Sequence, residues 1–379
     1  MRIALFDYLV TATNPVGGCH RRMLQGLSAD HQFTVFAVEF SNPAPERIDW
    51  IRIPAPKRPL ALLFVAFHLL APLYYIAYRL RKRVRFDLVQ CVESNLAFGD
   101  VRYVQFCHKR YLRSHWQSSR PSGFRRWGRW LDHKLHALAE TWVFRRGRIV
   151  SPSLGLKQEL LDEYPFLRGR VDVVSNPVEI DRLLRPRDFD RSAQRKQLGL
   201  DDADCVLAFV ALGHFERKSL PAILEALAEI SEPHLKLLVV GGTEGQIRPY
   251  RAKAAASSIA GQVIFCGMQT EVRRYLWMSD GFIFPSHYET FSLVAYEAAA
   301  AELPLIVSRV HGVADIAADR DNALIVEPNR ESILAALREF VCMSEVSRGA
   351  MGSRARQTVL RFGPEGFVNA WTRFYESLA

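Results

Sequence analysis

Short apolar runs, separated by longer mixed stretches, recur along the chain from its first residues. The runs predict strands at 3–8, 33–38, 87–91, 102–106, 148–151 and 171–174, and again at 206–210, 235–240, 263–265, 281–284 and 305–308. Helices are expected between them, for example at about 21–29 and at 221–230. Strands that alternate with helices favour parallel sheets covered by helices. We therefore expect an α/β protein with two doubly wound, Rossmann-like domains that face each other across a cleft.

A stretch rich in Arg, Asp and Pro, from 176 to 188, separates the two sets of strands. It predicts an N-terminal domain over 1–175 and a C-terminal domain over 176–363. The length of 379 residues suits two domains of ordinary size. Apolar and aromatic residues then recur at helical spacing in the last helix, at about 364–378: Phe367, Trp371, Phe374 and Tyr375. We expect residues 364–379 to pack back on the N-terminal domain.

The most apolar segment of the chain, residues 59–80, approaches the length of a membrane span. His68, Pro72 and a cluster of tyrosines oppose a crossing, and strand-like segments follow directly. The pattern favours a helix that is buried or lies at a membrane interface, ended by the basic run 79–83.

Basic residues exceed acidic ones by ten, with 50 Lys and Arg against 40 Asp and Glu. The excess is concentrated between Arg79 and Arg148, which hold seventeen basic and five acidic residues. A local excess of this size indicates a polyanionic partner: a membrane surface, a phosphate-bearing lipid or a nucleic acid.

Tryptophans are interleaved with this basic cluster. Together they predict a membrane or acceptor surface made of Arg110, Arg113, Trp116, Arg125, Arg126, Trp127, Arg129 and Trp130. Mixed basic and aromatic residues fit the interface of an anionic membrane. They also stack on nucleic-acid bases, but no helix-turn-helix, zinc-finger or RNP-like pattern accompanies them. We expect a membrane partner and no nucleic acid.

Six scattered cysteines form no pair or cluster with zinc spacing, so we expect buried free thiols and no metal site. The N-terminus begins with a strand-like segment and lacks the pattern of a signal peptide. These features predict a cytoplasmic protein, peripheral on the inner face of the plasma membrane.

Two glutamates stand eight positions apart in the segment 285–297. Glu289 is expected in the loop after a strand, and Glu297 more than a turn into the following helix, with Ser292 as its N-cap. The amides of Phe291, Ser292 and Leu293 would lie at the helix N-terminus, which stabilises an anion. A carboxylate accepts two hydroxyl hydrogen bonds at once, so this arrangement suits a nucleotide-sugar.

The segment after strand 206–210 carries a second anion signal. Arg217 and Lys218 stand directly before a predicted helix, with Ser219 as a plausible N-cap. Two cations at a helix N-terminus oppose the helix dipole, which is an argument for an anionic ligand there. Arg binds two phosphate oxygens at once and Lys adds a mobile charge, so the pair could hold a diphosphate without a metal.

Residues 206–328, with the segments 209–218 and 285–308, resemble the donor domain of retaining family 4 glycosyltransferases of the GT-B fold, including enzymes of lipopolysaccharide-core and lipid-linked glycan synthesis. The resemblance implies that Arg217 and Lys218 stabilise the departing nucleoside diphosphate. It implies that Glu289 faces the transferred sugar and that Glu297 binds the ribose. No cofactor is implied beyond the donor substrate, for which a UDP-sugar is favoured.

In the N-terminal domain the resemblance is thinner. Gly17 and Gly18 resemble the glycine loop near the donor phosphate, and His108 matches the family's histidine near the reacting carbon. Ser219 stands where the family usually has glycine, and His311-Gly312 stands where Gly-Gly is common. Ala323 replaces the glycine after Asn322, so the shape of the loops around the sugar differs.

The implied reaction is metal-independent transfer of a hexose to a glycan or lipid-linked acceptor, with retained anomeric configuration. Two other classes stay open. One is an epimerase or phosphorylase on the same fold, although no cofactor-lysine motif and no acid–base carboxylate pair is found. The other is a non-catalytic module that binds anionic lipid or nucleic acid through its basic surface.

Overall fold

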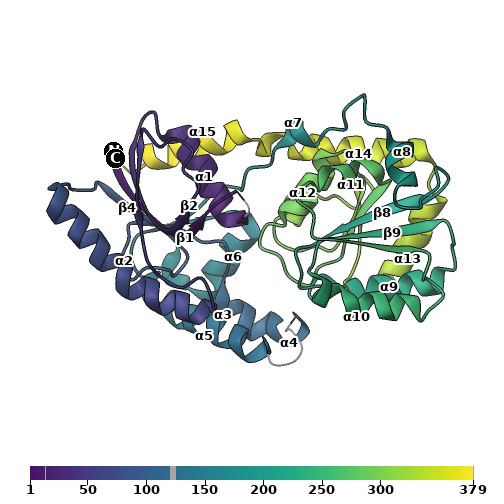
Figure 1. The fold of residues 1–379 in the computed structure, drawn as a ribbon, viewed down its shortest axis with the longest axis horizontal. Coiled ribbons are helices and arrows are strands. Elements are labelled where there is room, and N and C mark those ends of the chain that lie inside the picture. The colour runs from purple at the N-terminus through teal and green to yellow at the C-terminus, as the bar shows by residue number, and fades with distance from the viewer. Residues whose placement is uncertain (13, 120–124, 379) are drawn as a thin grey trace. The chain divides into compact units, whose positions relative to one another are not determined.

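The protein is described by a computed structural model that covers residues 1–378 except 13 and 120–124, and that leaves the side chains of 15, 118, 119 and 125 undescribed. The chain forms two compact units, each an α/β layered structure (Figure 1). The first unit holds residues up to 177, apart from 118–120, and the C-terminal segment from 364. The second unit holds 178–363.

The first unit is built on a parallel sheet of seven strands in the order β3-β2-β1-β4-β5-β6-β7. Its strands are β1 (Arg2–Val10), β2 (Gln32–Phe40), β3 (Ile48–Arg52), β4 (Leu88–Val92), β5 (Val101–Tyr103), β6 (Arg148–Ser151) and β7 (Val171–Val173). Successive side chains of β1 alternate between two cores. Ile3 and Leu5 pack on one face of the sheet, and Ala4 and Phe6 on the other. Both faces are therefore covered, as a doubly wound parallel sheet requires.

Helices cover this sheet on both sides, and a short π-helical turn, Tyr111–His115, follows α3. They are α1 (Pro15–Leu27), α2 (Leu60–Lys82), α3 (His108–Arg110), α4 (Trp116–Ser119), α5 (Arg125–Val143) and α6 (Leu154–Glu163), with a 3₁₀ turn at Pro165–Leu167. The segment expected at 59–80 is thus helical. By length and composition alone α2 could cross a membrane, but one such helix is weak support for a crossing.

The C-terminal helix α15 (Pro364–Glu376) packs against α1 in the first unit (Figure 1). Its buried side chains are Phe367, Trp371, Phe374 and Tyr375. The Tyr375 hydroxyl donates to Gln90 Oε1 at 2.7 Å, and the Gln90 amide lies 3.2 Å from His20 Nε2. Buried hydrogen bonds therefore fix the orientation of the helix, in addition to its apolar contacts.

The second unit has a parallel sheet of six strands in the order β10-β9-β8-β11-β12-β13. They are β8 (Cys205–Val210), β9 (Leu235–Val240), β10 (Val263–Gly267), β11 (Gly281–Phe284), β12 (Leu305–Val307) and β13 (Ala323–Ile325). The helices are α7 (Ile180–Leu183), α8 (Arg191–Lys196), α9 (Leu220–Ile230), α10 (Glu244–Ala255), α11 (Arg273–Met278), α12 (Leu293–Ala300), α13 (Arg330–Cys342) and α14 (Glu345–Val359), with 3₁₀ turns at Val313–Asp315 and Leu360–Phe362.

Strands β3 and β13 were not expected from the sequence. In β3 only Ile48 is fully buried, so its residues do not form an apolar run. Strand β13 has three residues and follows directly on the Asp319–Asn322 turn. Both lie at sheet edges, where pairing with one neighbour decides the strand and local sequence carries little signal.

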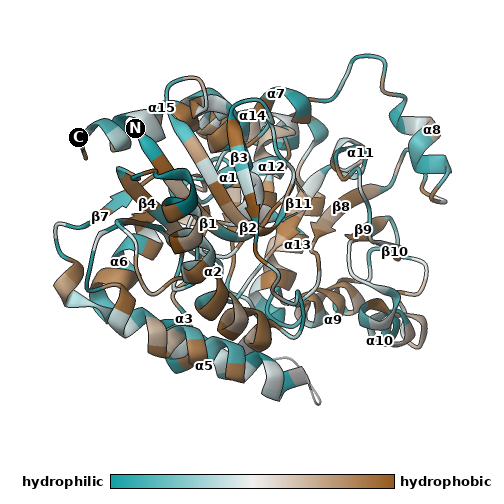
Figure 2. Cartoon of the chain, turned by 60° about the vertical axis from the view of Figure 1, so that its left-hand side comes forward, coloured by the Kyte–Doolittle hydropathy of each residue, from teal (hydrophilic) through white to brown (hydrophobic). Residues whose placement is uncertain are grey.

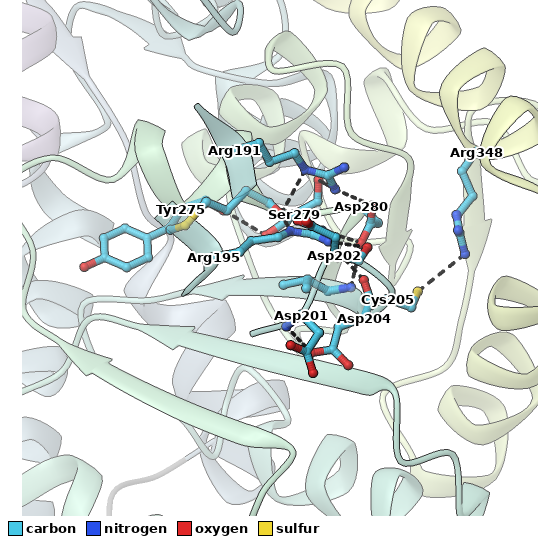
Figure 3. A network of polar contacts seen from close by, with 12 residues as sticks. Arg191, Arg195, Asp201, Asp202, Asp204, Cys205, Tyr275, Ser279, Asp280 and Arg348 are labelled. Carbon is cyan, nitrogen blue, oxygen red and sulfur yellow. Dashed lines mark hydrogen bonds and ion pairs between the residues drawn. The ribbon is translucent and has the colours of Figure 1, made fainter. Parts of the chain in front are cut away.

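The amino ends of β8 and β11 are held by a buried charge network around Asp280 (Figure 3). Arg195 Nη2 and the backbone amide of Val206 donate to Asp280 Oδ2 at 2.8 and 2.7 Å, and Arg191 binds Oδ1. Because Asp280 precedes β11 and Val206 lies in β8, the network fixes the alignment of the two central strands.

In both sheets the strand order reverses beside the first strand. The reversal lies between β1 and β4 in the first unit and between β8 and β11 in the second. The loops at the carboxyl ends of such a strand pair separate to opposite sides of the sheet and leave room for a ligand. Each unit therefore has one position that topology favours for binding.

Candidate active site

The two loops singled out in the second unit meet at its reversal point. The loop 211–219 follows β8, and the loop 285–292 follows β11, which is paired with β8. The amide of His287 donates to the Arg217 carbonyl oxygen at 2.8 Å, and the Ser286 hydroxyl oxygen lies 3.3 Å from the same atom. Residues about 70 positions apart in sequence are therefore held in one cluster.

Lys218, Arg217 and Glu289 form the charged centre of this cluster. Lys218 Nζ donates to Glu289 Oε1 at 3.0 Å, and Arg217 Nη2 lies 3.8 Å from the same oxygen. The Ser286 hydroxyl donates to it as well, at 3.1 Å. Two cations share one anion, so the centre keeps a net positive charge of one. Glu289 thus holds both cations in position before a diphosphate binds.

Burial and mutual contact shift the pKa values of this centre. Burial alone would raise the pKa of Glu289, but Lys218 and Arg217 outweigh it and lower that pKa below its usual value. Burial lowers the pKa of Lys218, and Glu289 beside it opposes that shift. Glu289 is therefore held as a carboxylate by its cationic neighbours.

Ser219 and Ser292 precede α9 and α12, but neither caps its helix through its side chain as expected. Both have left-handed backbone, with φ of +58° and +67°, and neither hydroxyl bonds to the first turn. An N-cap needs extended backbone to turn its oxygen toward the helix amides. The left-handed conformation also explains why glycine suits position 219, since only glycine adopts it without strain.

Three buried polar atoms at this site have no hydrogen-bond partner: Arg217 Nε, Ser219 Oγ and Ser292 Oγ. They are three of nine such atoms in the described part of the chain. Buried polar groups are normally satisfied, so a concentration of orphans indicates a site built to receive a polar ligand. The N-terminus of α12, with the amides after Phe291, adds its dipole at the same place.

Glu297 lies in the second turn of α12, and its side-chain carboxyl makes no hydrogen bond to the described residues. Burial raises its pKa to about 7. The side chain lines a cavity of about 360 Å³ together with Thr270, Arg182 and Arg273. An unpaired carboxyl on a cavity wall can accept hydrogen bonds from hydroxyl groups of a ligand.

In the first unit Gly17 and Gly18 lie inside helix α1, not in a loop before it. The helix starts at Pro15 and not at about 21, because Asn14 caps it by accepting from the Gly17 amide at 2.8 Å. A Cβ on Gly17 would lie 1.8 Å from the Leu9 carbonyl oxygen, whereas a Cβ on Gly18 would meet nothing closer than 3.7 Å. Gly17 is therefore required by the contact between α1 and β1, and Gly18 is not.

His108 is buried at the start of α3, after β5. Its Nε2 lies 3.4 Å from Glu93 Oε2, and its Nδ1 lies 2.9 Å from His133 Nδ1. Burial would lower the pKa of His108, but the hydrogen bond to Glu93 and the nearby Glu140 raise it above its usual value. A protonated His108 is the form that this environment favours.

Glu93 was not singled out in the sequence. It follows β4 at the reversal point of the first sheet and has left-handed backbone, with φ of +45°. A non-glycine residue in this conformation is held by its surroundings and often marks a functional site. The sequence shows only that Glu93 follows an apolar strand. That this strand lies at a reversal point is known from the strand order of the folded sheet.

Glu93, His108 and His136 bring possible ligand atoms within 4.8 Å of one another. The rings of His108 and His136 are stacked, with an angle of 11° and centroids 4.3 Å apart. Stacked rings direct their nitrogen lone pairs side by side, and metal ligands must converge on one point. A shared ion would require one ring to turn out of the stack.

The expected basic and aromatic surface is only partly a surface. Trp116 is 6% exposed and packs against Tyr111, so it is part of the core. Trp127 and Trp130 on α5 are exposed, and Arg126 lies over the Trp127 ring. Arg110 and Arg129 are half-buried. Arg113 is exposed, and its guanidinium lies 3.5 Å from the Glu163 carboxylate. Arg125 begins α5, but its side chain lies outside the described part.

Two families match the chain, one on each unit. Residues 20–182 match "Glycosyltransferase Family 4", and residues 190–358 match "Glycosyl transferases group 1". A D-inositol 3-phosphate glycosyltransferase from Rhodococcus jostii is 31% identical over 250 residues, which are 57% of this chain and 54% of that protein. The chain thus spans about half the length of this relative.

Solved structures resemble the whole chain. WaaG, a glycosyltransferase involved in lipopolysaccharide biosynthesis, has a TM-score of 0.75 at 17% identity and covers 97% of this chain and 99% of its own. Anabaena Alr3699/HepE in complex with UDP has a TM-score of 0.74 at 13% identity and covers 100% of both chains. At such identities the likeness shows the fold, and it confirms the expectation of two doubly wound domains.

Proposed function

We propose a reaction for this chain, which belongs to the glycosyltransferases of the GT-B fold: it moves a hexose from a nucleoside diphosphate sugar to a glycan or lipid-linked acceptor and retains the anomeric configuration. The observation that carries the proposal is the cluster of Arg217, Lys218 and Glu289 with three unpartnered buried polar atoms around it. Cations, orphan donors and a helix start in one place suit a diphosphate.

The proposed mechanism follows from charge. Cleavage of the bond between the anomeric carbon and the phosphate oxygen leaves a cationic sugar and a negative diphosphate. Arg217, Lys218 and the α12 N-terminus stabilise that negative charge without reorganising, which lowers the barrier. The acceptor oxygen attacks the anomeric carbon from the face that the diphosphate leaves. The acceptor proton passes to the leaving phosphate oxygen, so the products are the glycoside and the nucleoside diphosphate.

No metal is needed in this scheme, because the two side-chain cations offset the charge of the diphosphate. Glu289 accepts hydroxyl groups of the transferred sugar, and Glu297 accepts those of the ribose at the cavity beside Arg182 and Arg273. A UDP-sugar is the favoured donor. That choice is supported by the structure of Anabaena Alr3699/HepE, which holds UDP.

The acceptor side is proposed to work at the cytoplasmic face of the plasma membrane. Exposed Trp127 and Trp130 and the basic excess between 79 and 148 support contact with anionic lipid. A lipid-linked acceptor would be reached from that surface.

Isothermal titration of the protein with UDP-, GDP- and ADP-sugars tests the proposal, followed by transfer assays with the donor that binds. We expect one base to bind, and its affinity to fall in Arg217→Ala. Binding of none of the three donors, or binding that is unchanged in Arg217→Ala, would refute the assignment. Product analysis by NMR gives the anomeric configuration, and an inverted product would refute retention.

A further inference from the structure

Helix α2 is apolar on two opposite faces. One face packs into the core beside β1 and β2 through Leu63, Phe67, Ala71 and Tyr75. The opposite face carries a second row of apolar side chains three or four positions apart: Leu62, Val65, Leu69, Leu73, Ile76 and Leu80. Exposure reaches 65% at Leu69 and 74% at Leu80. We call this second row the α2 ridge.

Every protein exposes some single, scattered apolar side chains, but the six exposed side chains of the α2 ridge form a regular row. Spacing of three and four keeps all six side chains on one side of the helix. Soluble proteins rarely leave such a continuous apolar strip without a partner. The ridge therefore indicates a contact surface.

Helix α5 packs beside α2 (Figure 2). Its exposed side chains include Trp127, Leu131, Leu138 and Trp142, again spaced for one side of a helix. Tryptophan, with an apolar ring and a polar N–H, is the side chain most enriched at membrane interfaces. The neighbouring helix thus carries exposed interface-type residues of its own.

The charge carried by α2 itself is of one sign. Helix α2 contains no acidic residue, and its last turn carries Arg79, Arg81 and Lys82. A cavity of about 350 Å³ lies at this end, lined by Arg79, Arg83 and Arg85 together with Ile76, Leu80 and Val84. Three guanidinium groups beside apolar walls match a lipid, whose phosphate adjoins its acyl chains.

We propose that the α2 ridge is a membrane anchor that lies in the plane of an anionic bilayer, with its leucines among the upper acyl chains and Arg79, Arg83 and Arg85 on a lipid phosphate. The helix does not cross the bilayer, because its other face is part of the sheet's core. This inference deepens the proposed membrane partnership. It rests on the proposed function only for the choice of the cytoplasmic leaflet.

A second copy of the chain is the other plausible occupant. A self-complementary interface would place the basic end of one α2 near that of the other or against acidic groups. Because α2 has no acidic residue to pair with the arginines, a lipid headgroup fits the charge better. The experiment below distinguishes the two occupants.

Co-sedimentation with vesicles tests the anchor. The full-length protein is mixed with phosphatidylcholine vesicles that do or do not contain phosphatidylglycerol. The double variant Leu69→Glu/Leu73→Glu is compared with Val346→Glu, a control at an even more exposed apolar position on α14. We expect wild type and the control to bind the anionic vesicles, and the ridge variant to lose at least about tenfold in partitioning.

The arginine cavity is tested separately with Arg79→Gln/Arg83→Gln/Arg85→Gln. This variant is expected to lose the preference for anionic vesicles and to keep residual binding through the ridge. Free inorganic phosphate should not displace wild type, since it lacks acyl chains. Displacement by phosphate would overturn the lipid assignment.

Two further outcomes would overturn the anchor: equal vesicle binding by wild type and the ridge variant, or a wild-type dimer that the ridge variant dissociates. Thermal unfolding and UDP-glucose affinity, measured without vesicles, verify that each variant is folded. If nucleotide-sugars bind but vesicles do not, the anchor fails and the reaction stands. If vesicles bind but nucleotide-sugars do not, the reaction fails and the anchor stands.

Discussion

At the scale of single residues, the proposed donor site already holds its charged side chains buried and paired without a ligand. Glu289 holds Lys218 and Arg217 in place at 3.0 and 3.8 Å, and the Ser286 hydroxyl supports the carboxylate. The pair is thus preorganised, which is what makes electrostatic stabilisation of a leaving group effective.

Replacing Lys218 with Ala should remove most turnover. The loss of one preorganised cation is expected to lower kcat by about 10²- to 10³-fold, because the charge on the leaving diphosphate develops beside it. Steady-state kinetics measures the effect, and Lys253→Ala, an exposed lysine paired with Glu225, serves as the control. A variant with wild-type kcat would show that Lys218 plays no part in the chemistry.

Glu297 predicts a pH dependence of donor binding. Burial raises its pKa to about 7, so the unliganded protein keeps this proton up to near neutrality. The ribose hydroxyls need the ionised form as acceptor, so affinity for UDP-glucose should rise as pH rises through about 7 and then level off. Below that pKa the change approaches about tenfold per pH unit.

Titration calorimetry from about pH 5.5 to about pH 8.5 measures this dependence, since neither phosphate of UDP-glucose titrates there. The Glu297→Gln variant should bind more weakly and show a flat profile.

The raised pKa of Glu297 also makes the free energy of unfolding depend on pH. The folded state binds more protons than the unfolded state between the ordinary carboxyl pKa and about 7, so stability falls as pH rises through that window.

Glu93 predicts a shift in the titration of His108. The hydrogen bond between them raises the pKa of His108, so Glu93→Gln should lower it. NMR titration of the histidine ring protons, with His108→Gln for assignment, measures the change. A raised histidine pKa stabilises the fold at low pH, and this contribution is lost as pH rises through the folded-state pKa. An unchanged His108 titration in Glu93→Gln would contradict the contact.

At the scale of secondary-structure elements, the two adjacent glycines of α1 allow a role in packing to be distinguished from a role in ligand binding. A side chain at Gly17 would collide with the Leu9 carbonyl, and one at Gly18 has room. Gly17→Ala should therefore destabilise the protein and lower its melting temperature. Gly18→Ala should fold normally and weaken donor binding if its amide region serves the phosphate.

Differential scanning calorimetry and UDP-glucose titration of both variants measure this difference. Normal donor affinity in a stable Gly18→Ala protein would show that the glycine pair has only a packing role. Gly128→Ala is the control for a helical glycine whose added Cβ meets nothing within 4 Å, and it should leave the melting temperature equal or slightly raised.

At the scale of the whole molecule, the C-terminal helix α15 packs in the first unit, against α1. Trp371 is fully buried between Tyr103 of β5 and the other aromatics of α15. Trp371→Ala should cost about 3–5 kcal/mol of unfolding free energy through the cavity that it leaves. Urea unfolding followed by circular dichroism measures it. Tyr375→Phe removes the hydroxyl that bonds to Gln90 Oε1 at 2.7 Å and lies 3.5 Å from Met23 Sδ, and should cost about 1 kcal/mol.

The sequence by itself predicted the alternation of strands and helices along the chain and the two-domain fold class, and it located the charged segments 217–218 and 289–297. Apolar runs and charged loops are local, and local patterns record which residues are buried or exposed. The helical form of 60–82, the loop position of Glu289 and the helical position of Glu297 were readable for the same reason.

Only the tertiary structure decided which residues meet. The strands β8 and β11 are far apart in sequence, and their pairing brings Arg217 to Ser286. The left-handed turns at Ser219 and Ser292, the burial of Trp116 and the strained Glu93 beside His108 likewise depend on neighbours that the local pattern does not contain. The α2 ridge also depends on tertiary structure. The sequence of α2 is apolar around the whole helix, so only packing against the sheet shows which apolar side chains are buried and which stay exposed.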